Sequence, residues 1–446
     1  MHSFYPNIRL GVPVPERTPG MSSPSKENKS MKIALWCGGL AVAIMLAATS
    51  SNAQPLSGNR ADVKYVIMMV PDGMGLADVT AARILLNCGN QAVTSPFNFC
   101  AEGPGGQPLY LETLEHIGYQ RTYSKTNTIT DSSAAASAFA CGEKFVNNEV
   151  CFHADGAPHN PSVLELAQSR GMATGLVATQ TITHATPAAF ASHLANRNCE
   201  TEIARQYIEE TRPDVLLGGG QSKFQTDTPD VCGVAGHYID EAQATGYTYV
   251  DTKDAMNAAA QNTNRLLGLF ASKNLTPEYL GTRPPAEPRL PDMTAAALKI
   301  LQRSHAGFFL MVEGSLIDSG NHEENLQYQY GEIKAFDESV KLVLDWINAS
   351  PARRQHTLLI ILPDHETGGF AVKGAGEKGG ELPGAGLGPF VDSWVFPLFP
   401  GSQYDFEAHH TGGDVVFWSQ GPGSEALGRA IDNTYMYQVV KYMLKR

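Results

Sequence analysis

Four short apolar runs stand out in the hydrophobic pattern of the chain. The first, residues 63–70 (VKYVIMMV), stops at Pro71-Asp72-Gly73-Met74-Gly75, as a buried parallel strand does at a tight turn. The others are residues 174–178, 308–312 and 357–362. We expect all four runs to be strands of one sheet.

Helical periodicity fills the intervals between these runs. Residues 187–197 and 294–304 are helix candidates, and a further helix is expected after Ser132, running to Cys141-Gly142. In residues 332–347, apolar side chains recur at steps of three and four, which makes one stripe: Ile333, Phe336, Val340, Val343 and Ile347. Strands alternating with helices predict an α/β fold, a three-layer sandwich with a central, mostly parallel sheet covered by helices on both faces.

Two stretches depart from this alternation. Residues 221–290 are polar with little periodicity, and residues 367–403 contain the Gly-rich segment KGAGEKGGELPGAGLGPF. We expect both to be insertions, forming loops or a small accessory layer near the functional site. A functional lid and a passive surface loop both remain open for them.

The N-terminal 53 residues have the pattern of a targeting segment. Residues 1–30 are rich in Pro and Ser, and they are expected to be disordered or to precede a true start at Met31. Residues 31–53 contain Lys32, an apolar run over residues 33–48 and the small-residue site Ser51-Asn52-Ala53, the order of a secretory signal peptide. We expect cleavage near Ala53, secretion to the periplasm or medium, and one domain over residues 54–446. The apolar run is short for a membrane span, so a retained N-terminal anchor is the less favoured alternative.

Charge and cysteine content narrow the function further. Without residues 1–53 the chain loses 5 of 33 basic and 2 of 45 acidic residues, which leaves a net charge of −15. Such a chain repels nucleic acid and anionic membranes, so neither is an expected partner. An anionic substrate would need metal ions or arginine to invert the charge locally.

Six cysteines follow the predicted cleavage site, an even number that predicts disulfides in an exported chain. Fifteen pairings are open in principle. We expect neighbours to pair, as Cys88–Cys100, Cys141–Cys151 and Cys199–Cys232. The chain has no CxxC pair, so a thiolate zinc site is not expected.

Acidic and histidine residues gather where the predicted strands end. Asp72 follows the first run, and others follow later runs or stand near the C-terminus: Glu313, Asp318, His322, Asp364, His365, His409 and His410. Ligands bind at the carboxyl ends of strands in open α/β sheets. One such carboxylate is usually a cap or turn residue. A joint Asp/His set instead suits zinc, and an oxygen-rich set suits magnesium.

Residues 129–137 (ITDSSAAAS) place Ser132 before a run of small side chains. Small residues let a ligand approach a helix N-terminus closely, where free N–H groups and the helix dipole favour an anion. The alternative is an Ala-rich buried helix with Ser132 as its cap. On this stretch alone, the cap is the better interpretation.

From about Val63 to the C-terminus the chain resembles the alkaline phosphatase family. Six segments carry the resemblance, in the family's order and at similar spacing: PDGMG, ITDSSAAAS, THATPAAF, EGSLIDSGNH, PDHETGG and HHTGGD. Residues 287–293 (EPRLPDM) also resemble a family segment. The resemblance implies an alkaline-phosphatase-like catalytic domain over residues 54–446.

The resemblance also implies roles for individual residues. Ser132 would be the nucleophile, phosphorylated during turnover and held at the metal centre. Arg197, on the helix after THATPAAF, would grip two phosphate oxygens, steadied by Asp131. The implied ligands are Asp318, His322 and His410 for one Zn²⁺, Asp364, His365 and Asp72 for a second Zn²⁺, and Asp72, Thr186, Glu313 and His184 for one Mg²⁺.

At two positions the residue in this chain affects the roles that the resemblance implies. His184 stands where some members have Asp and others His, and its nitrogen would let Zn²⁺ or Co²⁺ replace Mg²⁺. Ser319 stands where many members have Lys, His or Trp, which would leave Arg197 as the main side-chain clamp.

The implied activity is hydrolysis of small phosphate monoesters to an alcohol and inorganic phosphate through a phosphoserine intermediate. The main alternative is a phosphodiesterase or sulfatase on the same scaffold, whose relatives use Thr or a Cys/Ser-x-Pro-x-Arg setting that the DSS segment lacks. A non-catalytic metal-binding or phosphate-binding protein would be expected to lack one of these residues. The sequence names no physiological substrate, and a homodimer, common in the family, remains open.

Overall fold

The computed structural model describes residues 63–87, 107–373, 390–394 and 409–444. A ten-stranded sheet organises this part of the chain. Its strands run in the order β16 (Ala430–Asp432), β2 (His116–Arg121), β15 (Val415–Gln420), β10 (Thr357–Ile361), β1 (Tyr65–Val70), β9 (Phe308–Glu313), β3 (Ala173–Thr181), β4 (Val215–Gly219), β8 (Leu266–Leu269) and β7 (Thr248–Val250).

The sheet is mostly parallel. Every neighbouring pair from β10 to β7 is parallel, whereas β15 runs antiparallel to both β10 and β2. At the centre, Tyr65 of β1 lies opposite both Thr357 and Phe308. The four predicted strands are therefore confirmed as β1, β3, β9 and β10, with β3 continuing to Thr181.

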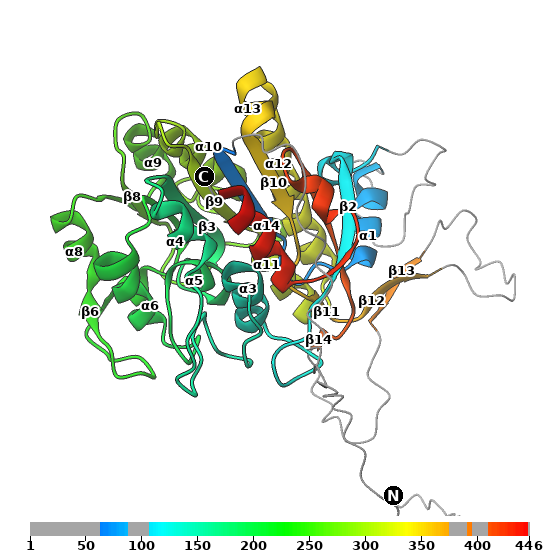
Figure 1. Ribbon diagram of the computed structural model, residues 1–446, viewed down its shortest axis with the longest axis horizontal. Helices are drawn as coiled ribbons and strands as arrows, with labels where there is room; N and C mark the ends of the chain where they lie inside the picture. The colour runs from blue at the N-terminus through cyan, green and yellow to red at the C-terminus, as the bar shows by residue number, and fades with distance from the viewer. Residues whose placement is uncertain (1–62, 88–106, 374–389, 395–408, 445–446) are drawn as a thin grey trace, which may run out of the picture. The chain divides into compact units, whose positions relative to one another are not determined.

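Helices cover both faces of the sheet (Figure 1). Alternate residues of each central strand enter different cores because successive side chains point to opposite faces. Thus Val66 and Met68 pack in one core, and Ile67 and Met69 pack in the other. Side chains in the first core come from α3 (Ser132–Cys141), α4 (Val163–Gln168), α5 (Ala185–Ala191), α6 (Glu200–Gln206), α8 (Tyr238–Ala244) and α14 (Thr434–Leu444). Side chains in the second core come from α9 (Lys253–Ala259), α10 (Leu290–Leu301) and α12 (Leu326–Asn348). The predicted three-layer α/β sandwich is confirmed.

The predicted helices differ from the observed ones mainly at their ends. The helix expected over 187–197 is α5, which ends before Ser192. Arg197 therefore does not lie on a helix, contrary to our expectation, because the backbone of Leu194 pairs with Val150 instead. The helix expected over 294–304 begins earlier, at Leu290, with a proline in its first turn. The stripe of residues 332–347 belongs to the longer α12.

Residues 221–290 contain more regular structure than their sequence predicts. They include β7 and β8, which extend one edge of the central sheet, as well as α7 (Gln221–Phe224), β5 (Gln225–Thr226), β6 (Gly236–His237), α8, α9 and η3 (Glu278–Leu280). The region is therefore not made of loops alone. Of residues 367–403, the structure describes 367–373 and 390–394, where β12 (Phe370–Lys373) pairs with β13 (Phe390–Trp394).

Two of the three expected disulfides are present, Cys141–Cys151 and Cys199–Cys232. The proposed pair Cys88–Cys100, the extension over 1–30 and the signal segment over 31–53 lie outside the described residues. Among the helices that the structure describes, none has the length and apolarity to cross a membrane.

Candidate active site

Three neighbouring strands at the centre of the sheet bring the acidic residues together. Asp72 follows β1, Glu313 is the last residue of β9, and Asp364 and His365 follow β10. Because β1 lies between β9 and β10 and all three are parallel, their carboxyl ends meet at one edge. All four side chains are fully buried.

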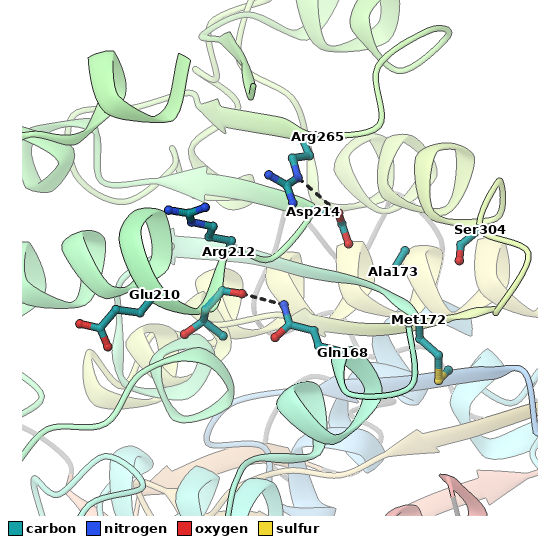
Figure 2. Close-up of a pocket in the computed structure, with 10 residues that line it drawn as sticks. Gln168, Met172, Ala173, Glu210, Arg212, Asp214, Arg265 and Ser304 are labelled. Atoms are coloured by element: carbon teal, nitrogen blue, oxygen red, sulfur yellow. Dashed lines mark hydrogen bonds and ion pairs between the residues drawn. The ribbon is translucent and has the colours of Figure 1, made fainter. Parts of the chain in front are cut away.

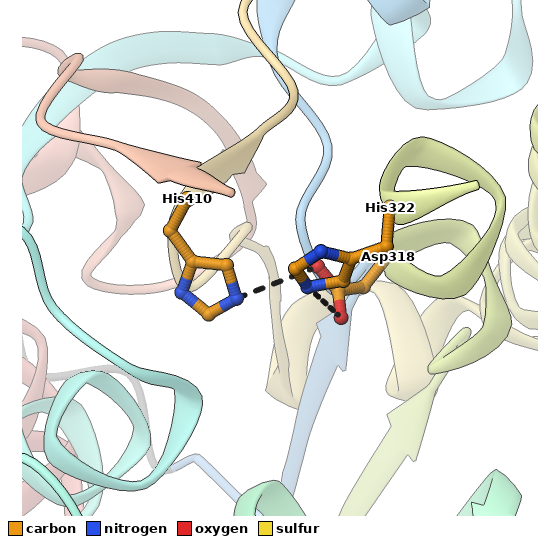
Figure 3. Close-up of side chains that lie close together, drawn as sticks. All are labelled: Asp318, His322 and His410. Atoms are coloured by element: carbon orange, nitrogen blue, oxygen red, sulfur yellow. Dashed lines mark ion pairs between the residues drawn. The ribbon is translucent and has the colours of Figure 1, made fainter. Parts of the chain in front are cut away.

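Asp318, His322 and His410 form one group with metal-ligand spacing. Asp318 and His322 lie one turn apart on α11 (Leu316–His322), with His322 Nε2 3.3 Å from Asp318 Oδ2. His410, on β14 (His410–Thr411), points toward them, with its Nε2 3.8 Å from Asp318 Oδ1 (Figure 3). Burial raises the pKa of Asp318, but the hydrogen bond and charge of His322 outweigh it and hold this pKa well below the usual range. Burial also lowers the pKa of His410 to about 4, so its imidazole is neutral and able to ligate.

A second group surrounds Nε2 of His365. This nitrogen lies 3.1 Å from Ser132 Oγ, 3.1 Å from Asp364 Oδ2 and 3.6 Å from Asp72 Oδ1. One potential ligand atom each of Asp72, His365 and Asp318 lie within 4.8 Å of one another, so Asp318 belongs to both groups. The structure thus places Asp72 and Asp364 around the His365 imidazole, and the metal-capable group at this place combines Asp72 and His365 with Asp318.

The third group consists of Asp72, His184 and Glu313. His184 and Thr186 lie at the beginning of α5, directly after β3. Burial raises the pKa of Asp72 well above its usual value, and the charges of Asp364 and Asp318 raise it further. Burial also raises the pKa of Glu313 to about 7. These carboxyls are costly to ionise where they stand, unless a cation joins them.

Unpaired polar atoms mark where such a cation fits. Among the described residues, the buried atoms without a hydrogen-bond partner include both carboxylate oxygens of Asp72 and of Glu313, Oγ1 of Thr186 and Nδ1 of His184. Native structures satisfy nearly all buried polar groups, and a cluster of exceptions indicates an ion or water site. Oxygen atoms with imidazole nitrogens are the donors that zinc and magnesium take, so the residues fit the ions that the sequence suggested.

Ser132 is the first residue of α3 and is 2% exposed. The preceding Asp131 caps this helix by accepting a hydrogen bond from the Ala134 N–H at 3.0 Å. The cap is therefore Asp131, which leaves the Ser132 hydroxyl directed at His365. The helix N-terminus adds a partial positive charge beside that hydroxyl.

Arg197 reaches the same place from the segment after α5. Its guanidinium lies 3.3 Å from Asp131 Oδ2 and 2.9 Å from His184 Nε2. A guanidinium only donates hydrogen bonds, so His184 accepts through an unprotonated Nε2. Burial, together with the charge of Arg197, lowers the pKa of His184 to about 4, which agrees with a neutral ring.

Several supporting residues were not predicted. Thr367 donates to Asp318 Oδ1 at 2.6 Å, and its hydroxyl lies 3.2 Å from His365 Nδ1. Asn321 donates to the carbonyl of Gly73 and to Asp78, which ties α11 to the turn after β1. Ser319 accepts from Gln180. Thr367 and Asn321 lie inside the quoted motifs, but only the fold reveals their contacts.

A separate cavity of about 490 Å³ lies at the amino ends of the parallel strands, on the side of the sheet away from the candidate site. Its lining includes Asp214 and Arg265, which directly precede β4 and β8 (Figure 2). Arg265 pairs with Asp214 at 3.7 Å. None of the metal-capable groups among the described residues lies there, so this cavity is not the candidate active site.

The fold and the site together define a class: α/β sandwich proteins with a candidate metal centre of buried carboxylates and imidazoles at the carboxyl ends of parallel strands. The chain belongs to the alkaline phosphatase family, whose family model matches residues 63–383. It is 36% identical over 330 residues to alkaline phosphatase 3 of Bacillus subtilis, a match covering 72% of this chain and 65% of that protein. It is also 32% identical over 454 residues to the streptomycin-6-phosphate phosphatase of Streptomyces griseus, a match covering 90% of this chain and 95% of that protein.

Solved structures agree with this family. The alkaline phosphatase of the Antarctic bacterium TAB5 aligns with a TM-score of 0.68 at 26% identity, covering 86% of this chain and 98% of that one. A histidine-to-aspartate variant of the TAB5 enzyme, with Mg bound in its M3 site, aligns with a TM-score of 0.67 at 27% identity, covering 86% of this chain and 98% of that one.

Proposed function

We propose that this protein hydrolyses phosphate monoesters to an alcohol and inorganic phosphate, with Ser132 as the nucleophile. The observation that carries the proposal is the position of the Ser132 hydroxyl, 3.1 Å from His365 Nε2 at the N-terminus of a buried helix. Asp72 and Asp364 flank that imidazole. Family membership supports the same activity.

In this proposal Arg197 binds the phosphate group, and Ser132 displaces the alcohol from it. Arg197 offers a planar fork of donors that matches two phosphate oxygens, and Asp131 holds that fork. Ser132 Oγ forms a bond to phosphorus as the ester P–O bond breaks and the alcohol leaves. Water then attacks the phosphoserine, the Oγ–P bond breaks, and inorganic phosphate is released.

We assign three divalent ions to the three groups of ligands. Asp318, His322 and His410 would hold one Zn²⁺, and Asp72, Asp364 and His365 would hold a second beside Ser132. Asp72, Thr186, Glu313 and His184 would hold Mg²⁺, with Zn²⁺ or Co²⁺ as competitors. Ions at the zinc positions stabilise the serine alkoxide and the leaving oxygen when bound.

His184 links the third group to Arg197. Ligation through Nδ1 requires the ring proton to sit on Nε2. That proton would face the Arg197 guanidinium, which only donates. Ligation through Nδ1 would therefore exclude the Arg197–His184 hydrogen bond, and the Arg197 guanidinium would then be available to phosphate oxygens.

The test is Ser132→Ala, with Ser339→Ala, at a buried serine of α12, as its control. Ser132→Ala should abolish turnover of an aryl phosphate and retain metal content, whereas Ser339→Ala should retain most turnover. Wild-type protein quenched in acid during turnover should carry a phosphate on Ser132 by mass spectrometry. Near-full activity of Ser132→Ala would refute the proposal. Rates on a matched phosphate diester and an aryl sulfate separate the monoesterase from the alternatives.

We also propose that the protein acts in the periplasm or medium after cleavage near Ala53. Its two disulfides support this proposal because such bonds persist in oxidising compartments. Small phosphate monoesters are the proposed substrates. Metal analysis should find two zinc ions and one further divalent ion per chain.

A further inference from the structure

Asn148 is an exposed loop residue that touches both members of the Arg197–Asp131 pair. Its backbone N–H donates to Asp131 Oδ2 at 2.9 Å. Its carbonyl accepts the backbone N–H of Arg197 at 2.9 Å. Because Arg197 itself reaches Asp131 Oδ2, Asn148 joins the carboxylate to the backbone of the arginine.

These two hydrogen bonds depend on one unusual backbone conformation. The donor belongs to the peptide before Asn148 and the acceptor to the peptide after it, so the dihedral angles of Asn148 set the angle between them. Its φ is 77°, in the left-handed region. Asn and Gly enter that region readily, whereas side chains with a branched β-carbon do so only with strain.

The loop around Asn148 is fixed on both sides. The Cys141–Cys151 disulfide closes it onto the end of α3. Val150 and Leu194 exchange two backbone hydrogen bonds, at 2.9 and 3.1 Å. Glu149, which is buried, accepts the N–H groups of Val146 and Ala154. A loop held in this way transmits its own backbone geometry to residues 194–197.

We propose that Asn148 is a positioning residue for phosphate binding. Through its left-handed backbone it fixes where the Arg197 guanidinium stands relative to Asp131 and Ser132, although it does not touch the substrate. The inference rests on the proposed role of Arg197 as the phosphate clamp. An exposed residue would thus influence the affinity for phosphate indirectly, through the position of Arg197.

The experiment compares Asn148→Val with Asn148→Gly in the metal-loaded protein. Valine opposes the left-handed conformation, so both backbone bonds should be lost, whereas glycine keeps the conformation and should preserve them. We expect the dissociation constant for inorganic phosphate, measured by calorimetric titration, to rise roughly ten- to a hundredfold in Asn148→Val, the scale on which misplaced positioning groups act. KM for an aryl phosphate should rise with it, while Asn148→Gly stays within about twofold of wild type.

Arg212→Val is the control for backbone strain. The backbone of Arg212 is also in the left-handed region, with φ of 52°. Arg212, however, lines the cavity at the amino ends of the strands, away from Arg197. It should lose a similar amount of thermal stability and leave phosphate affinity unchanged. If Asn148→Val does not fold, Asn148→Ala should weaken phosphate binding in the same direction by several-fold.

Two results would overturn the inference. One is equal phosphate affinity in Asn148→Val and Asn148→Gly; the other is equal weakening in both, which would place the effect in the side chain. Failure of the proposed function has a different signature, since wild-type protein would then not turn over phosphate monoesters at all. Phosphate titration needs no turnover and therefore separates the two failures.

Discussion

Replacing Gly73 by alanine should disrupt the proposed metal site as well as destabilise the fold. Gly73 has φ of +70° in the turn that follows β1, a conformation that costs a non-glycine residue about 1–2 kcal/mol. An added Cβ would lie 2.7 Å from Asp318 Oδ1 and 2.9 Å from Thr367 Oγ1. Relieving such overpacking costs about 1–3 kcal/mol more. The Gly73 N–H also donates to Asp364 Oδ1, so any shift of the turn moves two carboxylates of the site.

Gly171→Ala is the matched control, because Gly171 has φ of +72° and nothing within 4 Å of the added Cβ. It should lose only the conformational cost, about 1–2 kcal/mol. Gly73→Ala should lose about 2–5 kcal/mol by urea unfolding, bind less zinc by elemental analysis, and turn over aryl phosphate roughly a hundredfold more slowly. Equal stability losses in the two variants, with full zinc content in Gly73→Ala, would refute this account of the turn.

Two further predictions concern buried carboxyl groups. In metal-free protein, burial raises the pKa of Glu313 to about 7, so the folded chain holds a proton that the unfolded chain has lost above about pH 4.5. Removing bound metal with a chelator should therefore lower the melting temperature more at pH 8 than at pH 5.5. An equal drop in melting temperature at both pH values would contradict the raised pKa of Glu313. Burial also raises the pKa of Glu332 to about 7, with Glu332 accepting the N–H of Glu278. The wild type should lose about 3 kcal/mol relative to Glu332→Gln as pH rises from 4.5 to 7, measured by urea unfolding at both ends of that range; a constant difference would exclude this titration.

Much of the site could be predicted because strand ends have a clear sequence signal. An apolar run that stops at Asp72, or at Asp364 and His365, fixes both the strand and the residue at its carboxyl end. Parallel pairing then brings such ends together whatever their separation in sequence. The ligand groups follow from that geometry together with the family resemblance.

What could not be predicted depends on contacts between distant segments. Arg197 was expected on a helix because residues 187–197 suit one, but the pairing of Leu194 with Val150 ends α5 early. β7 and β8 were missed because three and four residues carry almost no period. The hydrogen bonds of Asn321 to Gly73 and Asp78 have no local signal, since each partner lies more than 240 positions away in the chain.

The arrangement of the central strands also determines when this protein can first act. Among the strands that the structure describes, β1 comes first in the chain and pairs only with β9 and β10. It must therefore wait for partners that are synthesised some 240 to 290 residues later. The proposed ligand Asp72, which follows β1, stays apart from the other proposed ligands until most of the chain has been synthesised, and His410 is added later still. Long-range pairing of this kind is slow and leaves apolar strands exposed meanwhile. Enzymatic activity is therefore expected only after nearly the whole chain has folded. C-terminal truncations that remove His410 should yield protein that lacks part of the proposed metal centre.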